Sequence, residues 1–159
     1  MILAAAPLAV AEHELPAHAL AEGGRFGGAE PAHAAELARW FENLAHLLHT
    51  LTAGRAASPV RVWSHHFDMD SVLALGGERT LGLGFSPGDD TFAEPYLYAL
   101  PTPYPDEHAL KPLPAPMEWV TDGWVGAVLR GSGVARLESD AQAELVAGFY
   151  AEAEAALAG

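Results

Sequence analysis

The chain has 159 residues, 50% of them hydrophobic and 18% charged, which suits one globular domain and excludes a disordered chain. It contains no cysteine, so disulfides, thiolate metal sites and cysteine nucleophiles are excluded. Its 8 Lys and Arg against 21 Asp and Glu give a net charge of -13, which disfavours nucleic acid and anionic membranes as partners. No apolar run reaches the roughly 18 residues of a membrane span, so we expect a soluble, cytoplasmic protein.

Residues 1–30 carry the weakest pattern. Pro7, Pro16 and two glycine pairs interrupt short apolar runs, which predicts at most one or two short strands. The apolar opening is similar to a secretory signal sequence, but the first cationic side chain is Arg25 and a charged leader is missing. We therefore expect residues 1–159 to form a single domain that includes this segment.

The residues from Pro31 onward show helical spacing. Pro31 suits a first helical position and Gly54 suits a helix end, which predicts a helix from Pro31 to Ala53. Its apolar residues recur at intervals of three and four, and they are Leu37, Trp40, Phe41, Leu44, Leu47, Leu48 and Leu51. The helix is therefore expected to be amphipathic, with one apolar stripe to bury.

A second helix is predicted near the end of the chain. Ser139 and Gln142 have the spacing of a capping box, which places the start of a helix at Ser139 and extends it to Ala158. The apolar residues expected on its inner face are Leu145, Val146, Phe149 and Leu157.

Four short segments between the helices have strand character. Val60–Ser64 is rich in β-branched residues and follows a Ser-Pro turn signal, which predicts a buried strand. Thr80–Phe85 and Glu94–Leu100 flank a Ser-Pro-Gly-Asp turn, whose Pro and Gly suit the central turn positions, so we expect a hairpin. Trp124–Leu129 follows an Asp-Gly turn signal and is the fourth predicted strand.

The segment 101–116 is dense in proline. Proline cannot donate a backbone hydrogen bond, so this stretch predicts an extended surface connection without a helix or a central strand. A helix, several successive strands and a closing helix together predict an α+β fold. The expected architecture is a single domain with an antiparallel or mixed sheet and two main helices packed on one face.

The polar residues best suited to chemistry begin at Trp63-Ser-His-His-Phe-Asp-Met-Asp70. If the predicted strand continues, side chains alternate between faces, so His66 and Asp68 share one face while His65 points to the other. Imidazole and carboxylate groups here also have a plain structural interpretation, in which they hydrogen-bond to one another and to nearby backbone at a strand end.

Further polar residues follow in the predicted hairpin. Asp89 lies in its turn, and Glu94, Tyr96 and Tyr98 alternate on one strand face. They are expected either to form a polar ladder or to be core aromatics whose two hydroxyls lie at the rim. The leading interpretation is a small-molecule-binding domain, and the residues expected to line its pocket are His65, His66, Asp68, Asp89, Glu94, Tyr96 and Tyr98.

Two alternatives come from other classes of protein. In a metal-dependent hydrolase, His66, Asp68 and Glu94 would hold zinc, manganese or iron, and a metal-bound water would be the nucleophile. In a structural or dimerisation module, the exposed tryptophans and the proline-rich segment would form the contact surface of a homo-oligomer.

Three motifs carry resemblances to known families. The segments 59–70, 84–98 and 123–129 together resemble a family of uncharacterised bacterial proteins known as a domain of unknown function. That resemblance implies a bacterial protein with an α+β fold and transfers no catalytic residue or cofactor. His65, His66 and Asp70 also match the His-His-x-x-x-Asp signature of the chloramphenicol acetyltransferase superfamily, but Ser71 stands where that family has glycine, and we interpret the match as chance.

Overall fold

Alternating apolar and small residues in the middle of the chain form an antiparallel sheet. The computed structural model describes residues 22–25, 30–64 and 66–157. Within them the sheet has six strands in the order β1-β2-β3-β4-β6-β5, and every neighbouring pair is antiparallel. The strands are β1 (Arg61–Val62), β2 (Met69–Gly76), β3 (Arg79–Ser86), β4 (Tyr96–Thr102), β5 (Glu118–Val120) and β6 (Gly126–Arg130).

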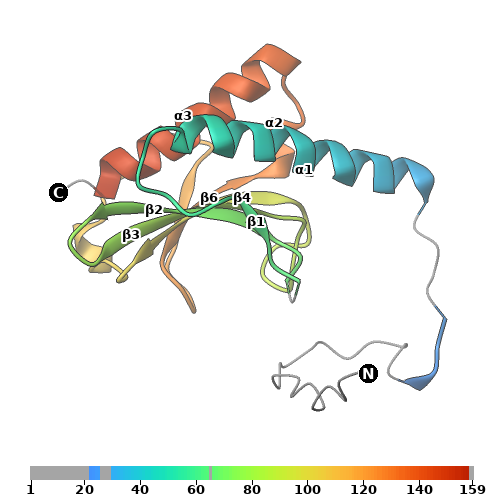
Figure 1. The fold of residues 1–159 in the computed structure, drawn as a ribbon, viewed down its shortest axis with the longest axis horizontal. Helices are drawn as coiled ribbons and strands as arrows, with labels where there is room; N and C mark the ends of the chain where they lie inside the picture. The colour runs from blue at the N-terminus through green and yellow to red at the C-terminus, as the bar shows by residue number, and fades with distance from the viewer. Residues whose placement is uncertain (1–21, 26–29, 65, 158–159) are drawn as a thin grey trace, which may run out of the picture.

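Two long helices cover one face of this sheet. They are α1 (Pro31–Thr52) and α3 (Ser139–Leu157), and a short α2 (Gly131–Val134) connects β6 to α3. Both long helices lie on the same side of the sheet (Figure 1). The prediction of a single α+β domain with its main helices on one face is therefore confirmed, and the sheet is antiparallel. None of the described helices is long and apolar enough to cross a membrane.

The core lies between the helices and the sheet. Period-two alternation sends Leu81, Leu83 and Phe85 of β3 to the helix-covered face, where they join Leu48 and Phe149 of the two helices. The Phe85 ring stacks with Trp40 at a centroid distance of 5.6 Å. The opposite face of the sheet, here called the open face, carries a smaller cluster of Phe92, Tyr96, Tyr98 and Val128.

The predicted strand at Val60–Ser64 is wrong in length and burial. Only Arg61 and Val62 form β1, and both are exposed. The physical reason is position, because β1 is an edge strand that pairs with two residues of β2 alone. The residues after it form a tight bend in place of a continuing strand, so the alternation argument for His65 and His66 does not apply; His65 itself lies outside the described residues.

Two strands and some boundaries were missed. Strand β2 follows the bend directly and turns into β3 through Gly76 and Gly77, whose φ angles are 98° and 60°. Strand β5 is only three residues long. Helix α3 begins at Ser139 itself, and the Gln142 N–H bonds to the Glu138 carbonyl, so Ser139 lies inside the helix and not at its cap.

The proline-rich segment is also more regular than predicted. Strand β4, which lies in the middle of the sheet, continues through Pro101 to Thr102, and Glu107–Ala109 forms one 3₁₀ turn. Proline is tolerated in this strand because β6 pairs with β4 only as far as Ala99. Beyond Ala99 one side of β4 forms no strand-to-strand hydrogen bonds, so the missing proline N–H destabilises the sheet only slightly.

Candidate functional site on the open face

A groove on the open face collects most of the predicted site residues. Its volume is about 520 Å³. Tyr96 and Tyr98 of β4 form its floor, and the two aspartates 68 and 70 enter it from the start of β2. Its lining residues are Trp63, His66, Asp68, Asp70, Tyr96, Tyr98, Leu100, Tyr104 and Trp124.

A glycine makes the floor of the groove possible. Asp70, Gly84 and Tyr98 lie side by side across β2, β3 and β4. A Cβ atom on Gly84 would overlap the Tyr98 ring, so the phenol lies directly over the glycine backbone. The Tyr98 hydroxyl thereby reaches past β3 and donates a 2.7 Å hydrogen bond to Asp68 Oδ2.

Asp68 is held by an unusual piece of backbone. The bend before it is closed by two hydrogen bonds, from the Phe67 N–H to the Trp63 carbonyl at 2.7 Å and from the Trp63 N–H to the Asp68 carbonyl at 2.8 Å. Phe67 has a φ of 58°, a conformation that costs a bulky residue about 1–3 kcal/mol. The other carboxylate oxygen, Asp68 Oδ1, is buried and has no hydrogen-bond partner among the described residues.

Asp70 adds a second carboxylate beside the first. Its Oδ1 accepts a 2.9 Å hydrogen bond from the Trp63 indole. Burial raises the pKa of Asp70; the indole hydrogen bond and the charge of Arg61 lower it, and the negative charge of Asp68 adds to the rise, so the net direction is upward. The groove therefore contains two neighbouring carboxylates of which one ionises with difficulty.

Asp89 organises the loop between β3 and β4. Its Oδ1 accepts the N–H groups of Thr91 and Phe92 at 2.8 and 2.9 Å, and its Oδ2 accepts the Tyr96 hydroxyl at 2.5 Å. Burial opposes ionisation of Asp89, but these hydrogen bonds and the charge of His66 outweigh it, so its pKa is lowered. Asp89 is thus an ionised support that orients Tyr96 at the edge of the groove.

The two tyrosines remain protonated at neutral pH. Burial raises the pKa of each phenol, and the hydrogen bonds to Asp89 and Asp68 raise it further for Tyr96 and Tyr98 respectively. Both hydroxyls therefore act as hydrogen-bond donors toward carboxylates, and neither is suited to act as a base.

The structure brings together most of the predicted pocket but excludes one member. His66, Asp68, Tyr96 and Tyr98 line the groove, and Asp89 joins it through Tyr96. Glu94 does not line it. Glu94 precedes β4, so the alternation that aligns Tyr96 with Tyr98 does not extend to it, and its carboxylate accepts the Ser132 N–H at 2.7 Å at the start of α2.

The predicted metal ligand set is not assembled. Across residues 22–25, 30–64 and 66–157, no three His, Asp or Glu side chains lie close enough to one another to hold a metal ion. His66, Asp68 and Glu94 are not brought together, since Glu94 accepts the Ser132 N–H at the start of α2.

Several groove residues were missed from the sequence. Asp70 could have been included, because it lies two positions from Asp68 and period-two spacing places both on the open face. Tyr104 and Trp124 come from segments far along the chain, and only the folded sheet brings them into the same groove as the aspartates at the start of β2. No local pattern could have indicated them.

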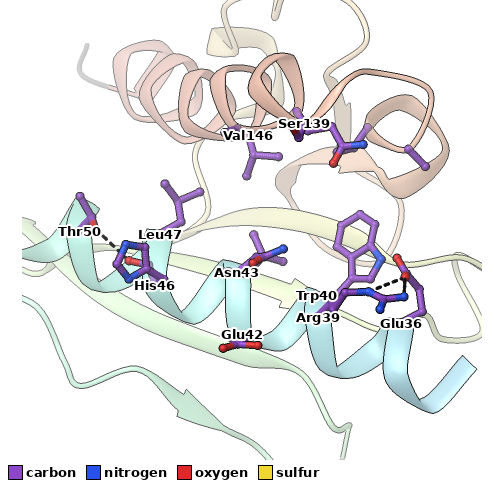
Figure 2. A pocket seen from close by; sticks show the side chains of 15 residues that line it. Glu36, Arg39, Trp40, Glu42, Asn43, His46, Leu47, Thr50, Ser139 and Val146 are labelled. Atoms are coloured by element: carbon purple, nitrogen blue, oxygen red, sulfur yellow. Dashed lines mark hydrogen bonds and ion pairs between the residues drawn. The ribbon is translucent and has the colours of Figure 1, made fainter. Parts of the chain in front are cut away.

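A larger hollow lies between the two long helices. It measures about 960 Å³ and runs between α1 and α3, with Trp40, Leu47 and Val146 among its walls (Figure 2). Its side chains hydrogen-bond locally: Arg39 pairs with Glu36 and the Thr50 hydroxyl donates to the His46 carbonyl in α1, and the Gln142 amide of α3 donates to the Leu137 carbonyl. Because the open-face groove holds two neighbouring carboxylates, each hydrogen-bonded by an aromatic side chain of its lining, we place the candidate site there.

Comparison with known proteins adds no assignment to this geometry. The chain matches no protein-family model, no curated protein sequence and no solved structure. The chemistry of the site is therefore argued from its own residues.

Proposed function

We propose that the protein is a small-molecule-binding domain whose ligand occupies the open-face groove. The observation that carries the proposal is Asp68 Oδ1, a buried carboxylate oxygen without a hydrogen-bond partner in the described part of the chain. Leaving such a group unpaired costs on the order of 1–3 kcal/mol, and more when it is charged. A ligand that donates a hydrogen bond at this point would recover that cost.

The shape and composition of the groove support the same proposal. Small-molecule sites are concave, mostly apolar and about 300–1,000 Å³ in volume, with a few fixed polar groups. The groove has this size, and its walls are largely aromatic. Its carboxylates are oriented before any ligand arrives, because Tyr98 holds Asp68 and Trp63 holds Asp70.

Features of the groove that destabilise the folded state also support this proposal. The strained backbone at Phe67 and the adjacent carboxylates of Asp68 and Asp70 each oppose folding. The Phe67 ring packs edge-on against Phe41 of α1 at a centroid distance of 5.3 Å, whereas the two carboxylates are not part of the core between helices and sheet. Local cost of this kind collects where a site must be prepared for a partner.

The test is a fragment screen by ligand-observed NMR on three proteins: the wild type, Asp68→Asn and Glu144→Gln. Glu144 is exposed on α3, on the helix side of the sheet, so its substitution removes one charge without touching the groove. We expect fragments whose affinity falls about tenfold in Asp68→Asn, which corresponds to about 1.4 kcal/mol, and changes less than about twofold in Glu144→Gln. A screen in which no fragment distinguishes Asp68→Asn from the wild type would refute the proposal.

A dimerisation module is the second candidate, and one observation favours it. Two of the large aromatic side chains that line the groove are exposed: Trp63 and Tyr104 are 38% and 53% exposed. Exposed apolar patches mark interaction surfaces. Light scattering over a range of concentrations tests this candidate, which requires a dimer that Tyr104→Asp dissociates.

A further inference from the structure

Negative charge is in excess among the residues that line the groove. Its described lining residues include Asp68, Asp70 and His66 but neither lysine nor arginine. The nearby arginines are engaged or lie outside: Arg130 pairs with Glu118 and lies 4.6 Å from the centre of the Phe92 ring, and Arg61 is exposed across from Asp70. An anionic ligand would therefore meet two carboxylates, with no lysine or arginine among the described lining residues to receive it.

The unsatisfied group in the groove is an acceptor. Asp68 Oδ2 already accepts from Tyr98, and Oδ1 is buried without a described donor. Ammonium and guanidinium groups present several N–H donors and no acceptor, and their hydrogen bonds to carboxylates are stronger than neutral ones. Such a group would also relieve the repulsion between Asp68 and Asp70, which a neutral hydroxyl cannot do.

The walls suit the rest of such a ligand. Trp63, Tyr104 and Trp124 offer aromatic surface, and Leu100 adds an apolar contact. Aromatic rings attract cations through their quadrupole and also accommodate flat apolar groups. The net charge of -13 raises the local concentration of cations around the whole molecule.

We infer that the groove binds an organic cation, with a protonated amine or guanidinium group paired with Asp68 and Asp70 and an apolar or aromatic body against the aromatic walls. This inference rests on the proposed small-molecule-binding function and specifies the ligand class for that same site.

The experiment compares three probes that share one ring and differ in charge. They are tryptamine, its neutral analogue tryptophol and the anion indole-3-propionate, titrated by calorimetry into the full chain at pH 7 and physiological salt. We expect tryptamine to bind, tryptophol to bind at least tenfold more weakly and indole-3-propionate to give no measurable binding. Asp68→Asn and Asp70→Asn should each weaken tryptamine about tenfold, and Glu144→Gln should change its affinity less than twofold.

Acid provides a second readout that does not depend on variants. Burial raises the pKa of Asp70, so this carboxyl is protonated earlier than an ordinary aspartate as the pH falls. Tryptamine affinity should therefore decrease as the pH falls through the pKa of Asp70, and this decrease should be smaller in Asp70→Asn. Thermal melts of each variant confirm that the variants remain folded.

The outcomes separate the inference from the proposed function. Tryptophol binding as tightly as tryptamine, with both weakened by Asp68→Asn, would overturn the cation inference while the groove stays a small-molecule site. Tryptamine binding that Glu144→Gln weakens as much as Asp68→Asn would show nonspecific attraction to an acidic surface and would also overturn it. If no probe binds while the fragment screen gives Asp68-dependent hits, the inference alone fails; if the screen gives none, both fail.

Discussion

Asp68 and Asp70 are two positions apart in the chain, yet their surroundings differ. Asp68 receives a phenol and keeps one buried oxygen free of described partners, whereas Asp70 receives an indole N–H and has a raised pKa caused first by burial. The difference arises because Asp68 belongs to the bend before β2 and Asp70 to the strand itself. We therefore expect substitution of Asp68 and substitution of Asp70 to have different effects.

The first prediction concerns Asp70→Asn. Because the folded state raises the pKa of Asp70 above the unfolded value near 3.8, folding binds its proton more tightly. The contribution of this group to the free energy of unfolding is then fully present below pH 3.8 and is lost as the pH rises through the folded pKa. Asparagine does not titrate and keeps an oxygen for the Trp63 indole. We expect Asp70→Asn to melt at a higher temperature than the wild type at pH 7, and the difference to vanish near pH 3.

The measurement is thermal denaturation of both proteins at several pH values between 3 and 7. The exposed Glu144→Gln variant serves as the control for loss of one negative charge. A variant that melts below the wild type by the same amount at every pH would contradict the prediction, since a loss that does not depend on pH cannot come from the ionisation of Asp70.

The second prediction concerns Gly84→Ala. The added methyl would overlap the Tyr98 ring, whose tip can move toward the groove, so the expected loss of stability is about 1 kcal/mol, the low end for overpacking. The larger effect should fall on the site, because the displaced phenol can no longer donate to Asp68. Groove binding should decrease at least as much as in Tyr98→Phe, which removes the same hydrogen bond.

A double-mutant cycle checks the cause. In a Tyr98→Ala background the ring is absent, so Gly84→Ala should cost little further stability or binding. Equal costs of Gly84→Ala in the two backgrounds would show that the glycine acts through something other than Tyr98.

At the level of single residues, the sequence predicted the site in part. Tyr96 and Tyr98 were found because strand alternation is local information, and Asp68 because the polar run is conspicuous. Glu94 was misplaced because its backbone lies before β4, where alternation no longer holds. Trp124 could not be found, because its place in the groove depends on β6 pairing with β4 and not with β5 alone.

At the level of elements, the third prediction concerns α3. Phe149 is fully buried between α3 and the sheet, so Phe149→Ala should lower the free energy of unfolding by about 3–5 kcal/mol. Glu152→Ala, an exposed change on the same helix, should stay within about 0.5 kcal/mol. Urea denaturation measures both. A loss below about 1 kcal/mol for Phe149→Ala would mean that α3 contributes little to the core.

The helices were easier to predict than the strands for a physical reason. Helix α1 repeats its apolar spacing over 22 residues and is bounded by Pro31 and Gly54, so many observations agree. Strand β5 has three residues. In β2, the polar Asp70 and Ser71 follow Met69; Asp70 lines the groove, and the Ser71 hydroxyl donates to the Ser58 carbonyl. Short or functional strands lack the repetition that identifies a helix.

At the level of the whole molecule, the two faces of the sheet differ in what they carry. The helix-covered face holds the larger core, and the open face carries the groove, its carboxylates and its aromatic walls. This separation allows the open face to hold costly features, such as the Phe67 bend, while the other face supplies stability. The negative net charge is a property of the whole chain and acts on both.

The fourth prediction follows from that charge. Self-repulsion at a net charge of -13 opposes the compact state, and the ion pairs of Arg39, Arg55 and Arg130 in the described part of the chain are at the surface, where each contributes little. Raising NaCl from 10 to 100 mM shortens the screening length from about 30 to about 10 Å. Repulsion should weaken more than the short ion pairs do, so the melting temperature at pH 7 should rise, by about 2–4 °C for each 1 kcal/mol gained.

The same salt step near pH 4.8, the isoelectric point of the sequence, is the control, because the net charge is close to zero there and the rise should disappear. A melting temperature that falls with salt at pH 7 would show that local attractions, among them Arg55 with Glu154, outweigh the overall repulsion.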